Sequence, residues 1–358
     1  MTINVARPYI PDRKNLQSYL DRALDSRWLT NNGPLVGELT SRLEDFLGVK
    51  NLLLLSNATM GLLLAFRLLE LKKPVLTTPF SFPATTSSLI WSQLEPVFGD
   101  IDAATFNLSA STLNDLENHS AILATHVFGN PCDVAAIKEI GAQSDIPIIY
   151  DAAHAFGVEL SGESLLNWGD ISVLSFHATK IFHCIEGGAI IIQDDELFEK
   201  AQSMINFGFN SNGEISQVGI NAKMNEFEAA MGLAILDEID IVMESHKHNW
   251  LTYKEHLNPK LKRQKLHNDA KYNYSYYPIL FSDETLLHRS VEALEEINVF
   301  PRRYFYPSLD TVPAYGREDV CLESNNLASK ILCLPLYVGL QDEEIIHICA
   351  TVNRVVET

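Results

Sequence analysis

Asp151 and His154 follow directly after the apolar stretch 146–150, IPIIY, which is typical of a buried strand. An acid and a histidine at the end of such a strand have two interpretations. Acidic and small residues are common where strands stop, so DAAHAFG (151–157) can be a simple turn. Alternatively, a positive charge lies above the carboxyl end of the strand, where the Asp151 carboxylate would stabilise it.

A lysine follows the next apolar stretch, in LSFHATK (174–180), which also offers Ser175 and His177. A lone lysine is usually a solvated surface charge. Beyond a strand end, however, Lys180 can form a Schiff base with an aldehyde, as in pyridoxal-phosphate enzymes. A protonated pyridine nitrogen would then be the positive charge next to Asp151, and His154 would lie near the ring hydroxyl. One strand fits between Asp151 and Lys180, so both residues can reach one cofactor.

Two further segments suit the same cofactor. In SNATMG (56–61), Asn57, Ala58 and Thr59 open a helix, where free N–H groups and the helix dipole favour an anion such as phosphate. The alternative is an ordinary helix cap. In FSFPATT (80–86), Phe82 precedes a helix that starts at a proline, so its ring can stack on a planar cofactor. The alternative for Phe82 is a core position.

The elements that must position these residues alternate along the chain from about residue 51 to 240. Apolar strand candidates alternate with helix candidates, which predicts an open α/β sheet, mostly parallel, with helices on both faces. Ligands in such sheets bind beyond the carboxyl ends of the strands. The strand candidates are 51–55, 74–78, 121–128, 146–150, 171–176 and 189–193, and the helix candidates are 58–69, 83–92, 134–143, 195–205 and one near Met224. In the last, Met224, Phe227, Met231 and Ile235 recur at helical spacing.

After residue 240 the regular alternation of strand and helix candidates ends. We therefore predict a large cofactor-binding domain over 1–240 and a smaller α+β C-terminal domain over 241–358. The first fifty residues read as an arm with helices at about 14–26 and 35–47. The small domain is expected to hold a long helix at its start, a strand in YSYYPILF (274–281), and helices at 284–297 and 342–355.

Composition excludes several classes of protein. The 358 residues include 46 acidic and 27 basic side chains, a net charge of −19 that argues against nucleic acid or an anionic membrane as partner. No apolar run is long enough to span a membrane, and no signal peptide is indicated. The five cysteines are scattered, which is typical of buried thiols in a reducing, cytoplasmic compartment. No metal site is expected.

Taken together, the segments resemble the sugar aminotransferases of the fold-type I pyridoxal-phosphate superfamily, often called the DegT/DnrJ/EryC1/StrS family. The likeness covers nearly the whole chain. It rests on RPYIP, WLTNNGPLVGELTSRLEDFLGVKN, SNATMGLLLAF, TTPFSFPATTSSLIW, EPVFGDID, THVFGNPCD, IYDAAHAFG, LSFHATK followed by EGGAI, and GINAKMNEFEAAMGLAIL. The combination is very specific, although no single segment is.

The resemblance implies a role for each matching residue. Lys180 would bind the cofactor covalently and move protons, Asp151 would pair with the pyridine nitrogen, and Phe82 would stack on the ring. The remaining expected cofactor contacts are Asn57, Ala58, Thr59, His154, Ser175, His177 and, from the neighbouring subunit, Asn221. A homodimer with shared active sites is therefore expected. Arg7, His183 and Tyr304 are the expected substrate contacts; His183 stands where many members have asparagine.

Within the family, the likeness is greatest to enzymes that aminate C4 of a dTDP-4-keto-6-deoxyhexose and make dTDP-4-amino-4,6-dideoxyglucose for surface polysaccharides. Transfer of an amino group from L-glutamate to such a nucleotide sugar is the expected reaction. A C3 sugar aminotransferase and a sugar dehydratase stay open as alternatives, although dehydratases of the family carry histidine in place of the lysine. A cofactor-binding regulator is a non-enzymatic alternative. A dinucleotide oxidoreductase lacks support, because no GxGxxG follows a strand.

Overall fold

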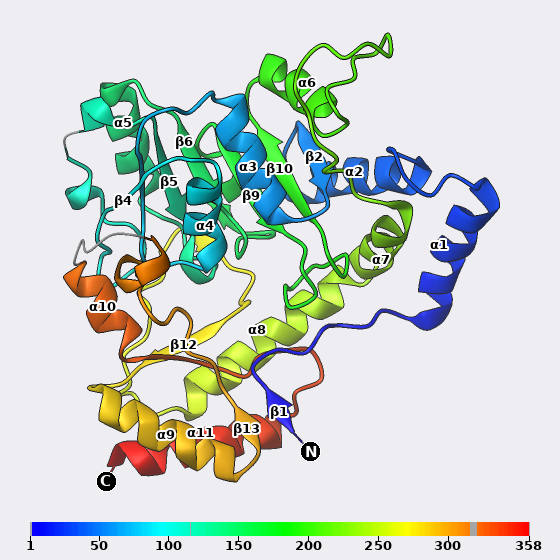
Figure 1. The fold of residues 1–358 in the computed structure, drawn as a ribbon. Coiled ribbons are helices and arrows are strands. Elements are labelled where there is room, and N and C mark those ends of the chain that lie inside the picture. Colours follow the sequence, from blue (N-terminus) through cyan, green and yellow to red (C-terminus); the bar gives the residue numbers. More distant parts are fainter. Residues whose placement is uncertain (1, 115, 316–320, 358) are drawn as a thin grey trace.

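Figure 1 shows the computed structural model, which describes residues 2–114, 116–315 and 321–357. A seven-stranded sheet lies at its centre, in the order β2-β10-β9-β6-β5-β3-β4. The strands are β2 (Leu52–Leu55), β3 (Val75–Thr77), β4 (Pro96–Phe98), β5 (Ala121–Thr125), β6 (Ile148–Asp151), β9 (Ile171–Ser175) and β10 (Gly188–Ile192).

Strand β10 is the antiparallel member of this sheet. It runs against both neighbours, β2 and β9, and every other pairing is parallel. The mostly parallel sheet predicted from the sequence is thereby confirmed. One edge of the sheet consequently collects the carboxyl ends of six strands and the amino end of β10, and Gly188 lies opposite both Leu55 and Ser175.

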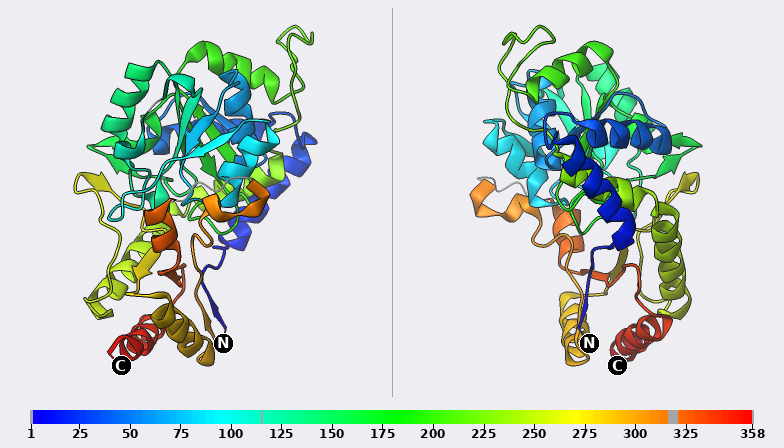
Figure 2. Two further views of the ribbon diagram at one scale, coloured as in Figure 1. Left: turned by 60° about the vertical axis from the view of Figure 1, so that its left-hand side comes forward. Right: turned by 90° about the vertical axis from the view of Figure 1, so that its right-hand side faces the viewer.

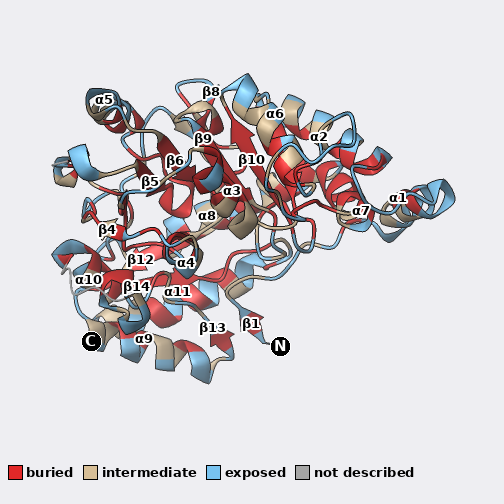
Figure 3. Ribbon diagram, turned by 45° about the horizontal axis from the view of Figure 1, so that its top comes forward, coloured by how far each residue is buried: buried red, intermediate tan, exposed pale blue. Residues whose placement is uncertain are grey.

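Helices cover both faces of the sheet because its strands are apolar on both faces. In β2, Leu52 and Leu54 join the cluster of buried side chains beneath α2, α5 and α7, while Leu53 and Leu55 join the cluster beneath α3, α4 and α6. Figure 3 shows the strands as the most buried part of the molecule. The helices are α2 (Pro34–Leu47), α3 (Ala58–Leu68), α4 (Pro83–Trp91), α5 (Val134–Ser144), α6 (Asp195–Met204) and α7 (Glu226–Leu236).

Helix α7 corrects one detail of the sequence interpretation. It begins only at Glu226, where Asn225 and Glu228 form a reciprocal capping box. Met224 precedes the helix and is buried, whereas the side chain of Phe227 is 42% exposed. The expected stripe of apolar residues is therefore divided between the core and the surface.

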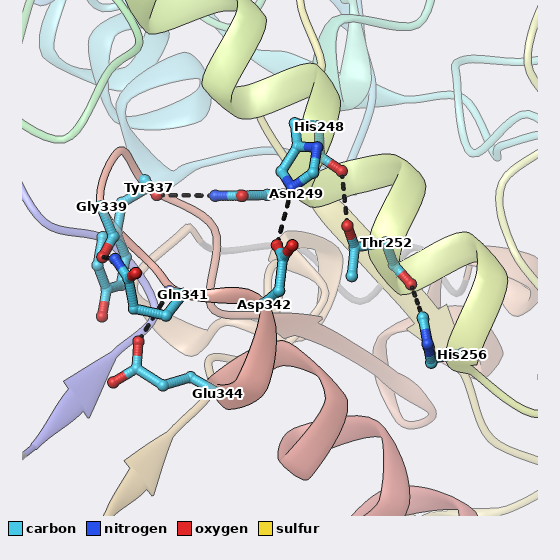
Figure 4. A network of polar contacts seen from close by, with 9 residues as sticks. All are labelled: His248, Asn249, Thr252, His256, Tyr337, Gly339, Gln341, Asp342 and Glu344. Carbon is cyan, nitrogen blue, oxygen red and sulfur yellow. Dashed lines mark hydrogen bonds and ion pairs between the residues drawn. The ribbon is translucent and has the colours of Figure 1, made fainter.

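The smaller domain contains a two-stranded antiparallel sheet covered by helices on one side. Helix α8 leads into it and is fixed to it by polar contacts (Figure 4): Asn249 Nδ2 donates to the carbonyl of Tyr337 at 3.0 Å, and His248 Nε2 lies 2.8 Å from Asp342 Oδ1. The elements are α8 (Ile239–His256), β12 (Tyr277–Leu280), α9 (Glu284–Glu296), α10 (Leu322–Ala328), β14 (Ile331–Leu334) and α11 (Asp342–Glu357).

Two short pairings cross the expected domain boundary at residue 240. Strand β1 (Ile3–Asn4) pairs with β13 (Val299–Phe300), so the chain starts in the small domain, and both termini lie there in Figure 2. Strand β11 (Ala270–Lys271) returns to pair with β7 (Glu159–Leu160), which also pairs with β8 (Glu163–Ser164). Local periodicity does not reveal pairings between two-residue strands, so the sequence could not predict this interleaving.

The N-terminal arm is the remaining part of the fold. Helix α1 (Arg13–Ser26) packs with α2 against α7, and Tyr19 and Arg42 both contact the carboxylate of Asp237 just beyond α7. All five cysteines are buried, as predicted. No helix of the described part of the chain is both long and apolar enough to cross a membrane.

Candidate active site

One pocket lies at the sheet edge where the strand ends collect. Its wall includes residues that follow β2, β3, β6 and β9, so the parallel topology brings together side chains far apart in sequence. Ten of the residues predicted from the sequence line it, namely Asn57, Ala58, Thr59, Phe82, Asp151, His154, Ser175, His177, Lys180 and Tyr304. The structure thus brings these residues together in one pocket, and their roles in binding and catalysis stay predictions.

The first turn of α3 forms one end of the pocket. Asn57 caps the helix by accepting a hydrogen bond from the Met60 amide at 2.9 Å, while the amides of Ala58 and Thr59 have no acceptor within the helix. Gly188 lies directly beneath this turn, and a Cβ atom there would be 2.6 Å from the Ala58 nitrogen. The glycine therefore allows the strand to support an anion-binding helix terminus.

Ser175 and His177 extend this end of the pocket from the carboxyl end of β9. Ser175 is half-buried, and its hydroxyl lies 3.5 Å from the His177 amide. The His177 ring is exposed and is held by Thr179, whose hydroxyl is 2.9 Å from Nδ1, and by Glu186 at 3.7 Å from Nε2. Hydroxyl and imidazole groups thus flank the free amides of α3.

Asp151 ends β6 inside the pocket wall and is 6% exposed. Its Oδ2 accepts a hydrogen bond from Thr85 Oγ1 at 2.7 Å, and its Oδ1 accepts one from the Ala153 amide at 3.1 Å. Burial raises the pKa of Asp151, while the two hydrogen bonds and the charge of Lys180 act to lower it. A cation bound within the pocket would therefore stabilise the ionised form of this buried carboxylate.

Lys180 lines the same pocket as Asp151 and follows β9, the strand next to β6. Burial lowers the pKa of Lys180 from 10.5 to about 8, although the charge of Asp151 opposes this shift. Its Nζ donates a hydrogen bond to the hydroxyl of Tyr276 at 3.3 Å. A lysine with such a pKa has a substantial neutral fraction near pH 8 and is suited to attack an aldehyde or to carry a proton.

His154 belongs to a stack of aromatic rings in the pocket wall. Its Nδ1 accepts a hydrogen bond from the Phe128 amide at 3.1 Å, so the proton of the neutral ring is on Nε2. Burial holds the pKa of His154 well below its usual value, and the charge of Lys180 lowers it further. The rings of Phe128 and Phe305 lie nearly parallel to it, at interplanar angles of 4° and 8°. His154 is thus a neutral donor with a fixed orientation.

Phe82 is the N-cap residue of α4, directly before Pro83. Phe82 is 48% exposed and lines the pocket. The alternative of a core position is wrong. An exposed ring in this place is available to stack on a planar ligand.

Three predicted residues lie outside the lining of this pocket. His183 is 2% exposed, its Nε2 bonds to the carbonyl of Tyr9, and its Nδ1 accepts from the Ile185 amide. Both ring nitrogens thus have partners within the chain, and the side chain holds the N-terminal arm; the predicted substrate contact of His183 stays a prediction. The sequence could not show this because the Tyr9 contact joins distant segments.

Arg7 also differs from the prediction in its immediate contacts. Its guanidinium lies 5.6 Å from the ring centroid of Tyr337, on the small domain. Within its own chain it is therefore not a lining residue of the pocket. Asn221 is exposed, and the neighbouring carbonyl of Ala222 accepts from the Ser56 amide. Its expected contact with the cofactor of a neighbouring subunit stays a prediction.

Three functional groups in the pocket lining or directly behind it were not among the site residues predicted from the sequence. Thr85 holds the Asp151 carboxylate, Tyr276 contacts Lys180, and Arg302 brings a second strong cation to the lining. The position of Thr85 one turn after Phe82 was the available signal. Tyr276 and Arg302 come from the small domain, and no local pattern connects them with the strand ends of the large domain.

These residues fit pyridoxal phosphate. The buried Asp151 carboxylate matches a protonated pyridine nitrogen, the α3 terminus above Gly188 matches a phosphate, and Phe82 offers a free ring face. Lys180 supplies the amine that binds the aldehyde. The cofactor expected from the sequence is therefore supported by the donor set of the pocket.

Comparison with known proteins agrees with this geometry. A dTDP-4-amino-4,6-dideoxy-D-glucose transaminase of Shigella dysenteriae is 38% identical, with 99% of each chain covered. The enzyme of the same name from Escherichia coli is 35% identical, with 97% of each chain covered. The crystal structure of DesI in the presence of its TDP-sugar product superposes with a TM-score of 0.93 at 33% identity, covering 99% of this chain and 93% of the other. Residues 11–353 match the DegT/DnrJ/EryC1/StrS aminotransferase family, and the chain belongs to this family of pyridoxal-phosphate-dependent sugar aminotransferases.

Proposed function

We propose that this enzyme transfers an amino group from L-glutamate to C4 of dTDP-4-keto-6-deoxy-D-glucose, giving dTDP-4-amino-4,6-dideoxy-D-glucose. The placement of Lys180, with its lowered pKa, in one pocket with the buried Asp151 carries the proposal of amino transfer. The sugar is inferred from the full-length relatives that are transaminases of this name.

Each residue of the pocket is proposed to bind a different part of the cofactor. When bound, pyridoxal phosphate supplies an electron sink for the carbanion formed next to the amino group. Asp151 keeps the proton on the pyridine nitrogen, with Thr85 and the Ala153 amide fixing its carboxylate. His154 would offer its Nε2 proton to the ring hydroxyl, and Phe82 would cover one ring face. Asn57, Ala58, Thr59, Ser175 and His177 would hold the phosphate.

Lys180 moves the protons of both half-reactions. Its neutral Nζ would take the α-proton of glutamate, and the resulting ammonium would deliver a proton to the carbon that carried the aldehyde of the cofactor. Water would then release 2-oxoglutarate and leave the amino group on the cofactor. In the second half-reaction the same atom delivers a proton to C4 of the sugar. The pKa of about 8 allows Nζ to both accept and donate a proton near neutral pH, and the Tyr276 hydroxyl at 3.3 Å holds it in place.

A dehydratase or a C3 aminotransferase is the principal alternative. The dehydratase is disfavoured because Lys180 is present. Incubation with L-glutamate and a panel of 4-keto and 3-keto nucleotide sugars, followed by mass spectrometry and NMR of the product, tests the proposal. An amine at C4 of the dTDP-linked sugar supports it. An amine at C3, or a deoxygenated sugar without nitrogen, contradicts it.

The active unit is proposed to be a homodimer with shared sites. Several apolar side chains near Asn221 are exposed in the single chain: Phe207, Ile220 and Phe227 are between 42% and 50% exposed. Two of them are adjacent, since the Phe207 amide donates to the carbonyl of Ile220. A second copy would bury this surface and carry its own Asn221 toward the cofactor phosphate.

The cellular setting is also a proposal. A cytoplasmic location suits a chain with scattered, buried cysteines and a nucleotide-sugar substrate. Neither nucleic acid nor membrane is proposed as a partner, given the net charge of −19. The product would serve a surface polysaccharide such as the O-antigen of lipopolysaccharide.

A further inference from the structure

Two neighbouring arginines of the small domain differ in their surroundings. Arg303 donates to Glu284 at 2.8 Å and to two main-chain carbonyls, and its guanidinium lies 3.5 Å from the ring centroid of Tyr306. Arg302 has no acidic partner among the described residues and lines the active-site pocket instead. Glu284 thus neutralises the charge of Arg303, whereas the guanidinium of Arg302 can still pair with an anionic ligand.

The position of Arg302 is fixed by its backbone. Its amide donates to the carbonyl of Cys333 at 3.1 Å, and the Cys333 amide donates back at 2.8 Å, which joins it to the end of the small sheet. Its guanidinium lies 4.6 Å from the ring centroid of Tyr304. Tyr304 in turn contacts Tyr276, the residue bonded to Lys180, with ring centroids 5.8 Å apart. One wall of the pocket therefore leads from Lys180 to Arg302.

The lining of the pocket carries charges of both signs: Asp151 and Glu186 are acidic, but neither forms an ion pair with Arg302 among the described residues. Arg302 and Lys180 are the two strongly basic side chains in the described lining, and Lys180 is committed to binding the aldehyde and moving protons. A guanidinium presents a planar fork that matches a carboxylate. The amino donor of the proposed reaction, and the keto acid formed from it, are both dicarboxylates.

We propose that Arg302 binds a carboxylate of the amino donor L-glutamate and of its product 2-oxoglutarate. The inference rests on the proposed function and names the residue that selects the acid substrate. The nucleotide sugar is a less suitable ligand for Arg302. Its reacting C4 and the C1 that carries the diphosphate are on opposite sides of the sugar ring, whereas the α-carboxylate of glutamate is bonded to the reacting carbon itself. A residue on the same wall of the pocket as Lys180 is therefore better placed to bind the α-carboxylate of glutamate than the diphosphate of the nucleotide sugar.

The test begins with binding of glutarate, a dicarboxylate that has no amino or keto group and cannot react. Isothermal titration into the cofactor-loaded enzyme compares wild type with Arg302→Gln, Arg302→Lys and Arg354→Gln. Arg354 is exposed near the end of α11, so its variant controls for the loss of one positive charge. Arg302→Gln is expected to weaken glutarate binding about tenfold to hundredfold, and Arg302→Lys by less. Equal affinity in all four proteins overturns the proposal.

The two half-reactions are then measured separately, by the absorbance change of the bound cofactor. With L-glutamate, the concentration for half-maximal rate is expected to rise at least about tenfold in Arg302→Gln. With the amino form of the cofactor and the ketosugar nucleotide, Arg302→Gln is expected to match wild type. A defect confined to the nucleotide-sugar half-reaction assigns Arg302 to the diphosphate and overturns the proposal.

The outcome is separable from failure of the proposed function. If wild type takes no amino group from glutamate, the proposed function fails, while the glutarate titration still reports whether Arg302 binds a dicarboxylate. Circular dichroism and the visible absorbance of the lysine-bound cofactor show whether each variant is folded. Should Arg302→Gln not fold, Arg302→Lys decides, since a lysine retains the charge but not the bidentate fork. Glutarate affinity equal to wild type in Arg302→Lys, with no folded glutamine variant, counts against the proposal.

Discussion

Thr85 Oγ1 donates a hydrogen bond of 2.7 Å to Asp151 Oδ2, so the first turn of α4 holds the carboxylate that ends β6. Ser81 bonds to Thr85 at 2.7 Å and to Thr125 at 3.0 Å, which extends the contact into a buried chain of hydroxyls. The orientation of Asp151 is therefore set by side chains from the carboxyl ends of two other strands, β3 and β5. This chain of contacts makes Thr85 a positioning residue for the proposed reaction.

Replacement of Thr85 by valine removes the hydrogen bond while keeping the shape of the side chain. Loss of this hydrogen bond is expected to raise the pKa of Asp151 further than burial alone does. Asp151 is then more readily protonated, and the neutral acid does not stabilise a charged pyridine nitrogen. A hydrogen bond to a charged group contributes about 1.5–3 kcal/mol, so kcat should fall roughly tenfold or more. Thr85→Ser should restore most of the activity. Steady-state kinetics of both variants provide the measurement, and a valine variant with wild-type kcat would contradict the assignment.

Asp151→Asn should nearly abolish turnover and leave the protein folded. Asparagine keeps the shape of the side chain but cannot hold the pyridine nitrogen in its charged form, so the expected loss of kcat is at least about a hundredfold. Asp133→Asn is the matched control, because Asp133 caps α5 outside the pocket and asparagine is an equally good cap. Turnover near that of the control would mean that Asp151 is only a turn residue.

Capture of the cofactor should depend on pH through the ionisation of Lys180. Only the neutral amine attacks the aldehyde, and the pKa of Lys180 is lowered by burial to about 8. The initial rate of capture by cofactor-depleted enzyme is therefore expected to rise with pH through about 8 and to level off above it. Stopped-flow absorbance after mixing with pyridoxal phosphate measures this profile.

The charge of Asp151 provides an internal control for this profile. It raises the pKa of Lys180, so its removal in Asp151→Asn should shift the midpoint to lower pH. A midpoint near 10.5 in the wild type would show that Lys180 is not desolvated before the cofactor binds. A shift to higher pH in the variant would contradict the coupling between the two residues.

Residues at the strand ends were predictable because their signals are local. Asp151 and Lys180 each follow an apolar stretch, and parallel topology then forces them to the same edge of the sheet. Arg302 and Tyr276 reach the site from the small domain. They are far in sequence from the strand ends, and local periodicity does not reveal contacts between such distant segments. His183 is a further case: its position near Lys180 suggested a substrate contact, whereas its bond to the distant Tyr9 carbonyl has no local signal.

Most helices of the fold were also predictable, to within one or two residues at their ends. Their caps are visible in the sequence, as Asn57 and Asp133 illustrate. Strands β4 and β1, which have three and two residues, were not predicted. Such segments have no periodicity of their own and become strands only when a partner strand lies beside them.

Asn221 supports the last prediction, that two chains share each active site. It is exposed in the single chain and lies among exposed apolar residues that include Phe207, Ile220 and Phe227. Two variants, Lys180→Ala and Asn221→Asp, are each expected to be inactive or nearly so, the first through loss of the amine and the second through repulsion between a carboxylate and the cofactor phosphate. Both should remain folded, since neither side chain belongs to the core.

Mixing these two variants under conditions that allow chain exchange should restore activity. In a heterodimer one site carries both defects and the other carries neither, so each heterodimer recovers up to about half of the wild-type activity. Activity after exchange, measured beside each variant treated alone, tests the expectation, and native mass spectrometry of differently tagged chains confirms that heterodimers form. Heterodimers without activity, or a stable and fully active monomer, would show that each site is complete within one chain. Asn221→Ala serves as the milder control: it removes the proposed contact without adding charge, so it should reduce phosphate binding less than the aspartate variant.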